Sequence, residues 1–355
     1  MHKLFTRKKQ LTLKKDNSPQ KPLTFICQRL FLWLLIIPVT LLSACSSLTA
    51  NAYYYPITPE NVNTRFMNTH ILSSFLIKSK KYNSLPIVEF SDLAWDEDEQ
   101  LLYVISDEGY LYHLKLSLTE NTLKSVEIVF ATRLKDKQGK KLKGKFRDAE
   151  GLALRNANNG KQGDSKLIIS FELKPRIVNY SPKGKFINKA SLVRNLHKKR
   201  FYRHQNNALE SVALHPKYGI LTAAEKPLKR KPLTQQSVYS SDGKEWNFEA
   251  SKTKNSSITA IEVLPNGDVL ILERAYNGLL SPIIITLRQL HIGKCKKDKL
   301  CDTSLIAKFN SANDWKLDNF EGLTHFRDNQ YFMVSDNNNN PLQKTILVLF
   351  EVIDQ

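Results

Sequence analysis

Several signatures of common enzyme folds are missing from this chain of 355 residues. It has no Gly-x-Ser-x-Gly elbow, no glycine-rich phosphate loop and no histidine pair at zinc-ligand spacing. Motif evidence for an α/β-hydrolase nucleophile, a P-loop nucleotide site or a histidine-bound zinc is therefore absent. Apolar residues at helical spacing are also scarce, which argues against a helical domain.

The apolar residues instead form short runs bounded by Gly, Pro, Asn and Asp. Val, Ile, Leu, Phe and Tyr dominate these runs, which include residues 101–105, 167–169, 269–272, 283–287 and 346–350. Short apolar runs between turn-forming residues are typical of β-strands. The sequence therefore predicts an all-β chain.

One phrase recurs five times: an acidic residue, a small or apolar pair, a turn, an apolar strand and a second acidic residue. The copies begin at Asp92, Glu150, Glu210, Thr259 and Glu321, and they end at Asp107, Glu172, Glu225, Glu273 and Asp336. The fourth copy lacks the leading acid and has Ser257 near that place. A fifteen-residue spacing in the first, third and fifth copies suits two short strands joined by a tight turn. Each copy is thus predicted to be a β-hairpin.

Repeated hairpins at this spacing indicate a β-propeller. Leading acids fifty-eight and sixty residues apart leave room for four strands in each unit, which is the size of a propeller blade. The start of the first strand and the end of the second lie at the same edge of a hairpin. We therefore expect the acids to converge on one mouth of the central channel, although solvated turn residues would give the same pattern.

The first 44 residues have the features of a lipoprotein signal peptide. A basic stretch precedes an apolar run at residues 30–42, which is short for a membrane span, and Leu42-Ser-Ala-Cys45 follows. This resembles the bacterial lipobox, which implies lipid attachment at Cys45, a tether over residues 45–70 and a propeller over residues 71–355. Ser46 is similar to an outer-membrane sorting signal, which places the domain on the periplasmic face. An uncleaved anchor is the alternative.

The net charge of +19 falls to about +12 without residues 1–44, so the domain stays basic. Basic runs occur at residues 135–147, 197–203, 226–231 and 294–299. An exported protein rarely meets nucleic acid, so we expect an anionic small molecule, lipid or envelope glycolipid as partner, or loops kept soluble by charge. Cys295 and Cys301 are expected to form a disulfide, since an exported chain meets an oxidising compartment.

Carboxylates that lie close together need a positive charge beside them to stay ionised, because like charges raise one another's pKa. A hard cation such as calcium, which takes six to eight oxygen ligands, would provide it. The candidate metal ligands are Asp107, Glu150, Glu172, Glu210, Glu225, Glu321 and Asp336, helped by Asn207, Asn319 and Asn337. Basic residues stand beside several of these acids: Arg147, Lys174, Arg176, Lys226 and Arg274. Metal-bound carboxylates and arginines together suit phosphate oxygens, whereas ordinary ion pairing is the plainer interpretation.

The phrases Arg147-Asp-Ala-Glu-Gly-Leu-Ala, Asn207-Ala-Leu-Glu-Ser-Val-Ala and Asn319-Phe-Glu-Gly-Leu-Thr, with Val-Ser-Asp336-Asn, resemble the exported bacterial phytase-like family. The resemblance covers most of residues 85–352. It implies a roughly six-bladed β-propeller, related to calcium-dependent propeller phytases, that hydrolyses phosphate or other esters. The chain departs from the family pattern at Ser211, where glycine is usual, and in the fourth copy.

Three functional hypotheses follow. The first is a lipid-anchored periplasmic hydrolase of phosphoesters or related esters, with calcium at the channel mouth. In it Glu150, Glu210 and Glu321 hold the metal, and Arg147, Arg176 and Arg274 orient the anionic group. The second is a non-catalytic propeller whose basic face binds an envelope protein or an anionic glycolipid. The third is a lactonase-type propeller that hydrolyses a neutral cyclic ester.

Overall fold

The computed structural model describes residues 52–60, 62, 64–78, 81–204, 206–278, 281–296 and 300–353. They belong to one compact unit, Ser47–Gln355. The expected signal peptide and the expected lipidation site at Cys45 lie outside the described residues. Within the described part, no helix is long and apolar enough to cross a membrane.

Five antiparallel sheets account for nearly all of the strands. Blade 1 consists of β6 (Phe90–Asp96), β7 (Leu101–Ser106), β8 (Tyr110–Thr119) and β9 (Thr122–Arg133). Blade 2 consists of β10 (Ala149–Arg155), β11 (Lys166–Phe171), β12 (Arg176–Tyr180) and β13 (Phe186–Lys189). Blade 3 consists of β14 (Leu209–His215), β15 (Gly219–Ala224), β16 (Gln235–Ser240) and β17 (Glu245–Glu249). Blade 4 consists of β18 (Ser256–Val263), β19 (Val269–Ala275), β20 (Ile284–Cys295) and β21 (Cys301–Asn310).

Blade 5 is assembled from both ends of the described chain. It joins β22 (Asn319–Arg327), β23 (Gln330–Asp336) and β24 (Thr345–Val352) to β3 (Thr69–Ile77). The register pairs Ile346 with Leu76 and Phe350 with Ile71. Two short strands, β1 (Ala52–Tyr54) and β2 (Arg65–Phe66), also pair with β3. Part of the segment expected to be a tether therefore belongs to this sheet.

The expectation of six blades is wrong, and the five legible copies give the true number. Six blades were implied by the family resemblance alone. Residues upstream of β6 complete blade 5 and form a small hairpin of β4 (Lys81–Tyr82) and β5 (Leu85–Pro86). The all-β propeller itself is confirmed.

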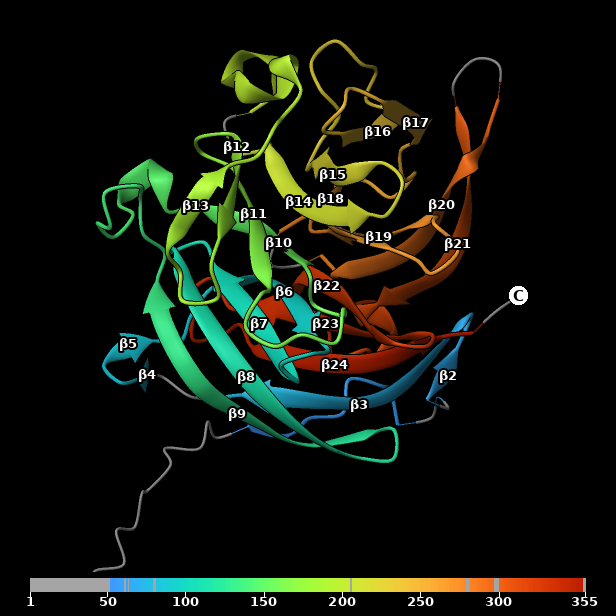
Figure 1. The fold of residues 1–355 in the computed structure, drawn as a ribbon. Helices are drawn as coiled ribbons and strands as arrows, with labels where there is room; N and C mark the ends of the chain where they lie inside the picture. The colour runs from blue at the N-terminus through green and yellow to red at the C-terminus, as the bar shows by residue number, and fades with distance from the viewer. Residues whose placement is uncertain are drawn as a thin grey trace, which may run out of the picture. The chain divides into compact units, whose positions relative to one another are not determined.

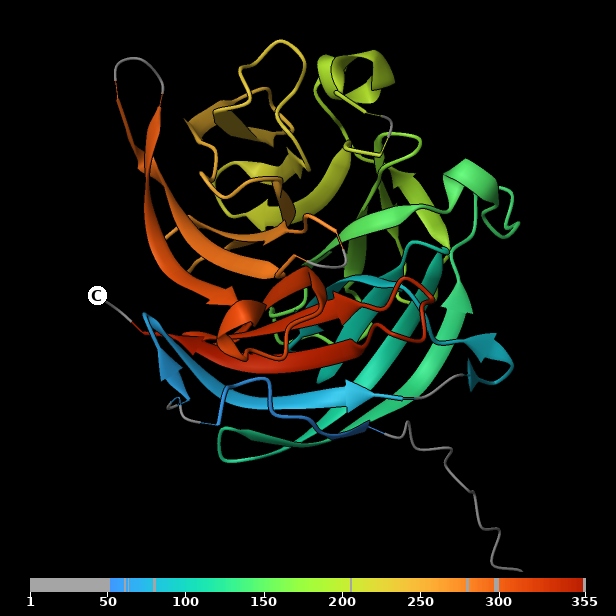
Figure 2. The same ribbon diagram turned by 180° about the vertical axis from the view of Figure 1, so that it is seen from behind.

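The blades surround a common axis (Figures 1 and 2). The first strand of each blade is innermost, and these strands contact one another in the closed sequence β6, β10, β14, β18, β22 and back to β6. Apolar side chains fill five clusters, and each cluster lies between two neighbouring blades. Burial of this apolar surface holds adjacent blades face to face.

Every innermost strand contains a register shift near its start. A bulge leaves one residue without a partner across the hairpin and re-aims its side chain. The unpaired residues are Ser91, Glu150, Glu210, Thr259 and Glu321. The first copy of the repeat is thus displaced by one residue, because Ser91 rather than Asp92 matches Glu150.

Asp92 joins three blades instead of facing the axis. Its buried carboxylate accepts hydrogen bonds from the backbone N–H of Leu93 at 2.8 Å, Leu152 at 2.7 Å and Leu323 at 3.0 Å. The corresponding position in blade 5 is Gly322, where an added Cβ would lie 2.8 Å from the Cα of Asp92. Glycine is required there by this close approach of two strands. The prediction that Asp92 converges with the other acids on the channel mouth is therefore wrong.

Helical structure in the described residues consists of short 3₁₀ turns between strands. They are η1 (Gly144–Phe146), η2 (Arg194–His197), η3 (Lys199–Phe201) and η4 (Ser311–Asn313). The expected disulfide is present and joins Cys295 to Cys301 at the outer end of the β20–β21 hairpin.

Candidate functional site

The five bulge residues form a ring around the propeller axis. Ser91, Glu150, Glu210, Thr259 and Glu321 line a cavity of only about 10 Å³. A cavity of that size holds about one water molecule. Side chains therefore close the axis at this level, and any substrate would have to approach the ring from the mouth.

A second ring comes from the residues at the mouth end of the second strands. The hairpin registers align Ser106, Phe171, Ala224, Glu273 and Ser335. The next residues along the chain are therefore equivalent: Asp107, Glu172, Glu225, Arg274 and Asp336. Blade 4 places an arginine where the other blades place an acid. Glu273, which ends the fourth copy of the repeat, lies one position earlier and forms an ion pair with Arg288 at 3.2 Å.

Two groups of carboxylates at the mouth share Glu172. One group is Asp148, Glu150 and Glu172, and the other is Glu172, Glu210 and Glu225. Within each group, one oxygen from every residue lies within 4.8 Å of the others. Glu150 and Glu210 are the bulge residues of blades 2 and 3, and Glu172 lies close to both of them. Both groups offer the hard oxygen ligands that calcium prefers and could hold a metal.

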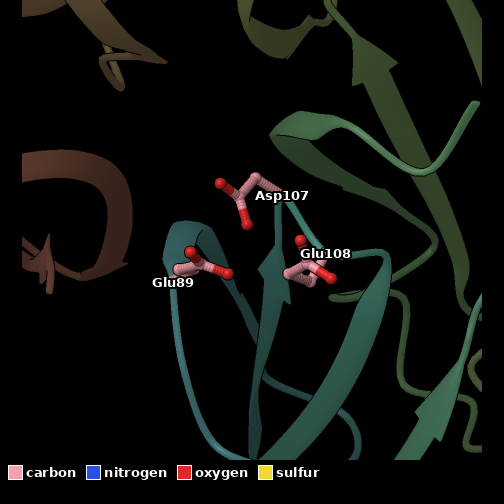
Figure 3. A group of neighbouring side chains, drawn as sticks. All are labelled: Glu89, Asp107 and Glu108. Carbon is pink, nitrogen blue, oxygen red and sulfur yellow. The ribbon is translucent and has the colours of Figure 1, made fainter. Parts of the chain in front are cut away.

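A third group lies on blade 1 and consists of Glu89, Asp107 and Glu108. Figure 3 shows their carboxyl groups around a common space at the end of the blade. The backbone N–H of Glu89 donates to the Asn337 side chain of blade 5 at 3.1 Å, and Arg147 of blade 2 pairs with Glu108. This group is therefore tied to both neighbouring blades.

Five carboxyls at the mouth have strongly raised pKa values: Asp107, Glu150, Glu172, Glu210 and Asp336. Burial is the main cause for each, and neighbouring carboxylates add to it. The pKa rises to about 8 for Glu172, to about 8 for Asp336 and to about 9 for Asp107, and it lies well above the usual range for Glu150 and Glu210. The Oδ1 atom of Asp107 is also buried without a hydrogen-bond partner. Without a cation, these groups would be protonated at neutral pH.

The two remaining expected metal ligands are already engaged by the protein. Glu321 accepts from Arg274 Nη1 at 2.6 Å and from Asn319 Nδ2 at 2.8 Å. Asp336 accepts from the backbone N–H of Asn338 at 2.9 Å and from Asn319 Nδ2 at 3.4 Å. Arg274 of blade 4 therefore neutralises Glu321, and the three groups of carboxylates that could hold a metal lie on blades 1 to 3.

The expected substrate-orienting arginines have different environments. Arg147 pairs with Glu108, and Arg274 pairs with Glu321, so both neutralise acids of the mouth. Arg176 lies 3.6 Å over the ring of Phe171 and donates to the Lys174 carbonyl at 3.0 Å. The structure brings Glu150, Glu172, Glu210 and Glu225 together but does not place the three arginines around one common point.

Sequence reasoning missed four charged residues at the mouth: Glu89, Glu108, Asp148 and Lys199. Asp148 lies two residues before the bulge of blade 2, and Glu89 holds the same position in blade 1. Aligning the copies on Ser91 would have revealed this pair. Burial raises the pKa values of Asp148 and Glu172, and the positive charge of Lys199 partly opposes that rise. Lys199 belongs to a loop between blades, where the repeat gives no signal.

Three solved structures show low similarity to this chain. They are the Dos1 propeller (TM-score 0.34, 12% identity, 80% of this chain and 72% of that chain), U3-55K (0.36, 9%, 76% and 77%) and the Cps50 (Swd1) β-propeller domain of Myceliophteria thermophila (0.36, 9%, 76% and 98%). These similarities are too weak to support a conclusion about this chain. The search of curated proteins gave no match.

The comparison with family models is more informative. The model described as "Phytase-like: Esterase-like activity of phytase" matches residues 86–339, from just before the first blade to just before the final strand. The matched region contains the three acidic groups at the mouth. This chain therefore belongs to the phytase-like family of β-propellers.

Proposed function

We propose that the protein is a calcium-dependent hydrolase of phosphoesters or related esters with an anionic group. The observation that carries this proposal is the position of Glu172 in two carboxylate groups at once. Each group offers three carboxylates to a cation. Burial and the crowding of negative charge raise the pKa values of Glu150, Glu172 and Glu210, and a bound cation would relieve this crowding by displacing the protons. Calcium bound there would polarise a phosphoryl or carbonyl oxygen.

The side chains at the mouth would bind the cation, attract the substrate and close the axis. Asp148, Glu150, Glu210 and Glu225 supply oxygen ligands on either side of Glu172. Lys199 provides positive charge next to Asp148 and Glu172, where an anionic substrate would approach. The ring of bulge residues closes the axis below, so that the substrate stays at the mouth.

Calorimetric titration with calcium, followed by hydrolysis assays, tests the proposal. We expect saturable calcium binding that weakens at least about 100-fold in the Glu150→Gln/Glu210→Gln variant, because two anionic ligands are lost. Hydrolysis of a phosphomonoester should require calcium and fall by a similar factor. Glu127→Gln, on β9 away from the mouth, is the matched control and should behave as wild type. Full activity in the double variant would refute the assignment, and turnover of a lactone alone would favour the lactonase-type hypothesis.

A second candidate function rests on a basic pocket on blade 2. This cavity of about 1030 Å³ is lined by Lys137, Lys140, Lys141, Lys143 and Lys189 and by the aromatic residues Phe146, Tyr180 and Phe186. Positive charge beside aromatic side chains suits an anionic glycolipid. Binding to phosphatidylglycerol vesicles that is indifferent to chelator and lost on Lys140→Glu/Lys143→Glu, in a protein that does not bind calcium, would favour this non-catalytic function.

We further propose that the protein is a lipoprotein on the periplasmic face of the outer membrane. The apolar run at residues 30–42 followed by Cys45 supports this location. So does the disulfide between Cys295 and Cys301, because disulfides persist in oxidising compartments. Intact-mass analysis of protein extracted from envelopes checks it, since an unmodified Cys45 would contradict lipid attachment.

A further inference from the structure

Blade 4 carries an Asp–His–Ser hydrogen-bond chain far from the acidic groups. Nδ1 of His291 lies 2.7 Å from Oδ2 of Asp268, and Nε2 of the same ring lies 2.8 Å from Oγ of Ser304. Both distances are within hydrogen-bond reach. The order of atoms is that of a catalytic triad, which is recognised by geometry and roles rather than by sequence position.

Three neighbouring segments bring these residues together. Asp268 ends the turn before β19, and the next residue, Val269, pairs with Leu290 on β20. Asp268 is thus level with His291 on one side of β20. On the other side, Ser304 of β21 pairs with Gln289, whose side chain lies on the same face of β20 as that of His291. The turn before β19 lies at the end of the blade opposite the mouth. The hydrogen bonds that join Asp268, His291 and Ser304 are therefore separate from the carboxylate groups.

Surrounding contacts favour one tautomer of the histidine. An ionised Asp268 can only accept, so Nδ1 of His291 carries the proton and donates it to Oδ2. Nε2 is then free to accept the hydrogen of the Ser304 hydroxyl. Gln289 Nε2 also donates to Asp268 Oδ2 at 2.8 Å and holds the carboxylate in place. The side chains of His291 and Asp268 are 15% and 17% exposed, and Ser304 is half-buried, so all three residues are partly open to solvent.

We propose that Ser304, His291 and Asp268 form a second hydrolytic site that acts on small activated carboxylic esters without a metal. Ser304 Oγ bonds to the acyl carbon while its proton passes to His291 Nε2. The ester C–O bond then breaks, and the alcohol leaves with that proton. Water next attacks the acyl group with His291 Nε2 taking its proton, the Ser304–acyl bond breaks, and the proton returns to Ser304 Oγ as the carboxylic acid leaves. Asp268 stabilises the imidazolium that forms in both steps.

Labelling with a fluorophosphonate probe tests the site. Serine attack on the probe releases fluoride and leaves a stable phosphonyl–serine, which peptide mass mapping locates. We expect the label on Ser304, no label in Ser304→Ala, and labelling slowed about 100-fold or more in His291→Gln and in Asp268→Asn. Ser241→Ala, at a turn of blade 3, is the matched control and should label as wild type.

Dependence on calcium distinguishes the activity of this site from that proposed for the carboxylate groups at the mouth. Labelling and hydrolysis of p-nitrophenyl acetate should persist in EDTA and in Glu150→Gln/Glu210→Gln, whereas the proposed phosphoester activity should not. Labelling of folded protein no faster than that of heat-denatured protein, or a label that remains in Ser304→Ala, would overturn the proposal. Either result would leave the calcium-dependent function untouched.

Discussion

Replacement of Asp92 by alanine is expected to lower the free energy of unfolding by at least about 3 kcal/mol, because three buried backbone N–H groups lose their acceptor and each costs about 1–3 kcal/mol when unsatisfied. The groups belong to Leu93, Leu152 and Leu323, which lie in blades 1, 2 and 5. Denaturation in urea, followed by tryptophan fluorescence, measures the change.

Two further variants make the result specific to the carboxylate. Asp92→Asn keeps the shape of the side chain but turns an N–H₂ group toward one of the three backbone donors. Its free energy of unfolding should therefore lie between those of the wild type and of Asp92→Ala. Asp302→Ala removes an exposed carboxylate paired with Lys296 and should leave the midpoint close to wild type. Equal midpoints for Asp92→Ala and Asp302→Ala would show that the three-blade contact contributes little.

The protein without a divalent cation is expected to lose stability as pH rises from about 5 to about 9. Glu172, Asp336 and Asp107 titrate at about 8, 8 and 9 in the folded chain, above the usual 4.5 for Glu and 3.8 for Asp. Between these limits the native state binds more protons than the unfolded state. Each such proton lowers the free energy of unfolding by about 1.4 kcal/mol per pH unit.

Bound calcium should flatten this dependence, because it keeps the carboxylates ionised in place of protons. Unfolding curves in EDTA and in calcium at pH 5, 7 and 9 measure the two slopes. Glu172→Gln removes one titrating group and should reduce the slope in EDTA. A stability that is constant with pH in EDTA would contradict the raised pKa values, and identical slopes in the two solutions would argue against a cation at the mouth.

The repeated phrase was sufficient to predict the hairpins, the propeller and the convergence of acids, since strand periodicity and turn residues are local properties. The prediction failed where a shift of one residue decides which side chain belongs to a ring. Ser91 and Thr259 occupy bulge positions without a carboxylate, so Asp92 seemed to be the first leading acid, and Glu273 seemed to belong to the ring that Arg274 occupies. A bulge shifts the register by one residue without any change in composition, and the sequence pattern does not reveal it.

Features made by distant segments were beyond the sequence pattern. The pairing of Arg274 with Glu321 depends on how blades 4 and 5 meet. Likewise, Asp268, His291 and Ser304 are brought together by the pairing of three segments rather than by a motif. By contrast, Cys295 and Cys301 are close in sequence, and their disulfide was predicted correctly.

Closure of the last blade has a consequence for how the protein is made. The strand β3 is synthesised near the beginning of the described chain, yet its partner β24 is among the last residues to emerge. Until then β3 has an open edge, and unpaired edges invite association with other chains. Pairing over so long a sequence separation is also slow. During synthesis and any export, the nascent chain would therefore benefit from a chaperone that shields this edge until the ring can close.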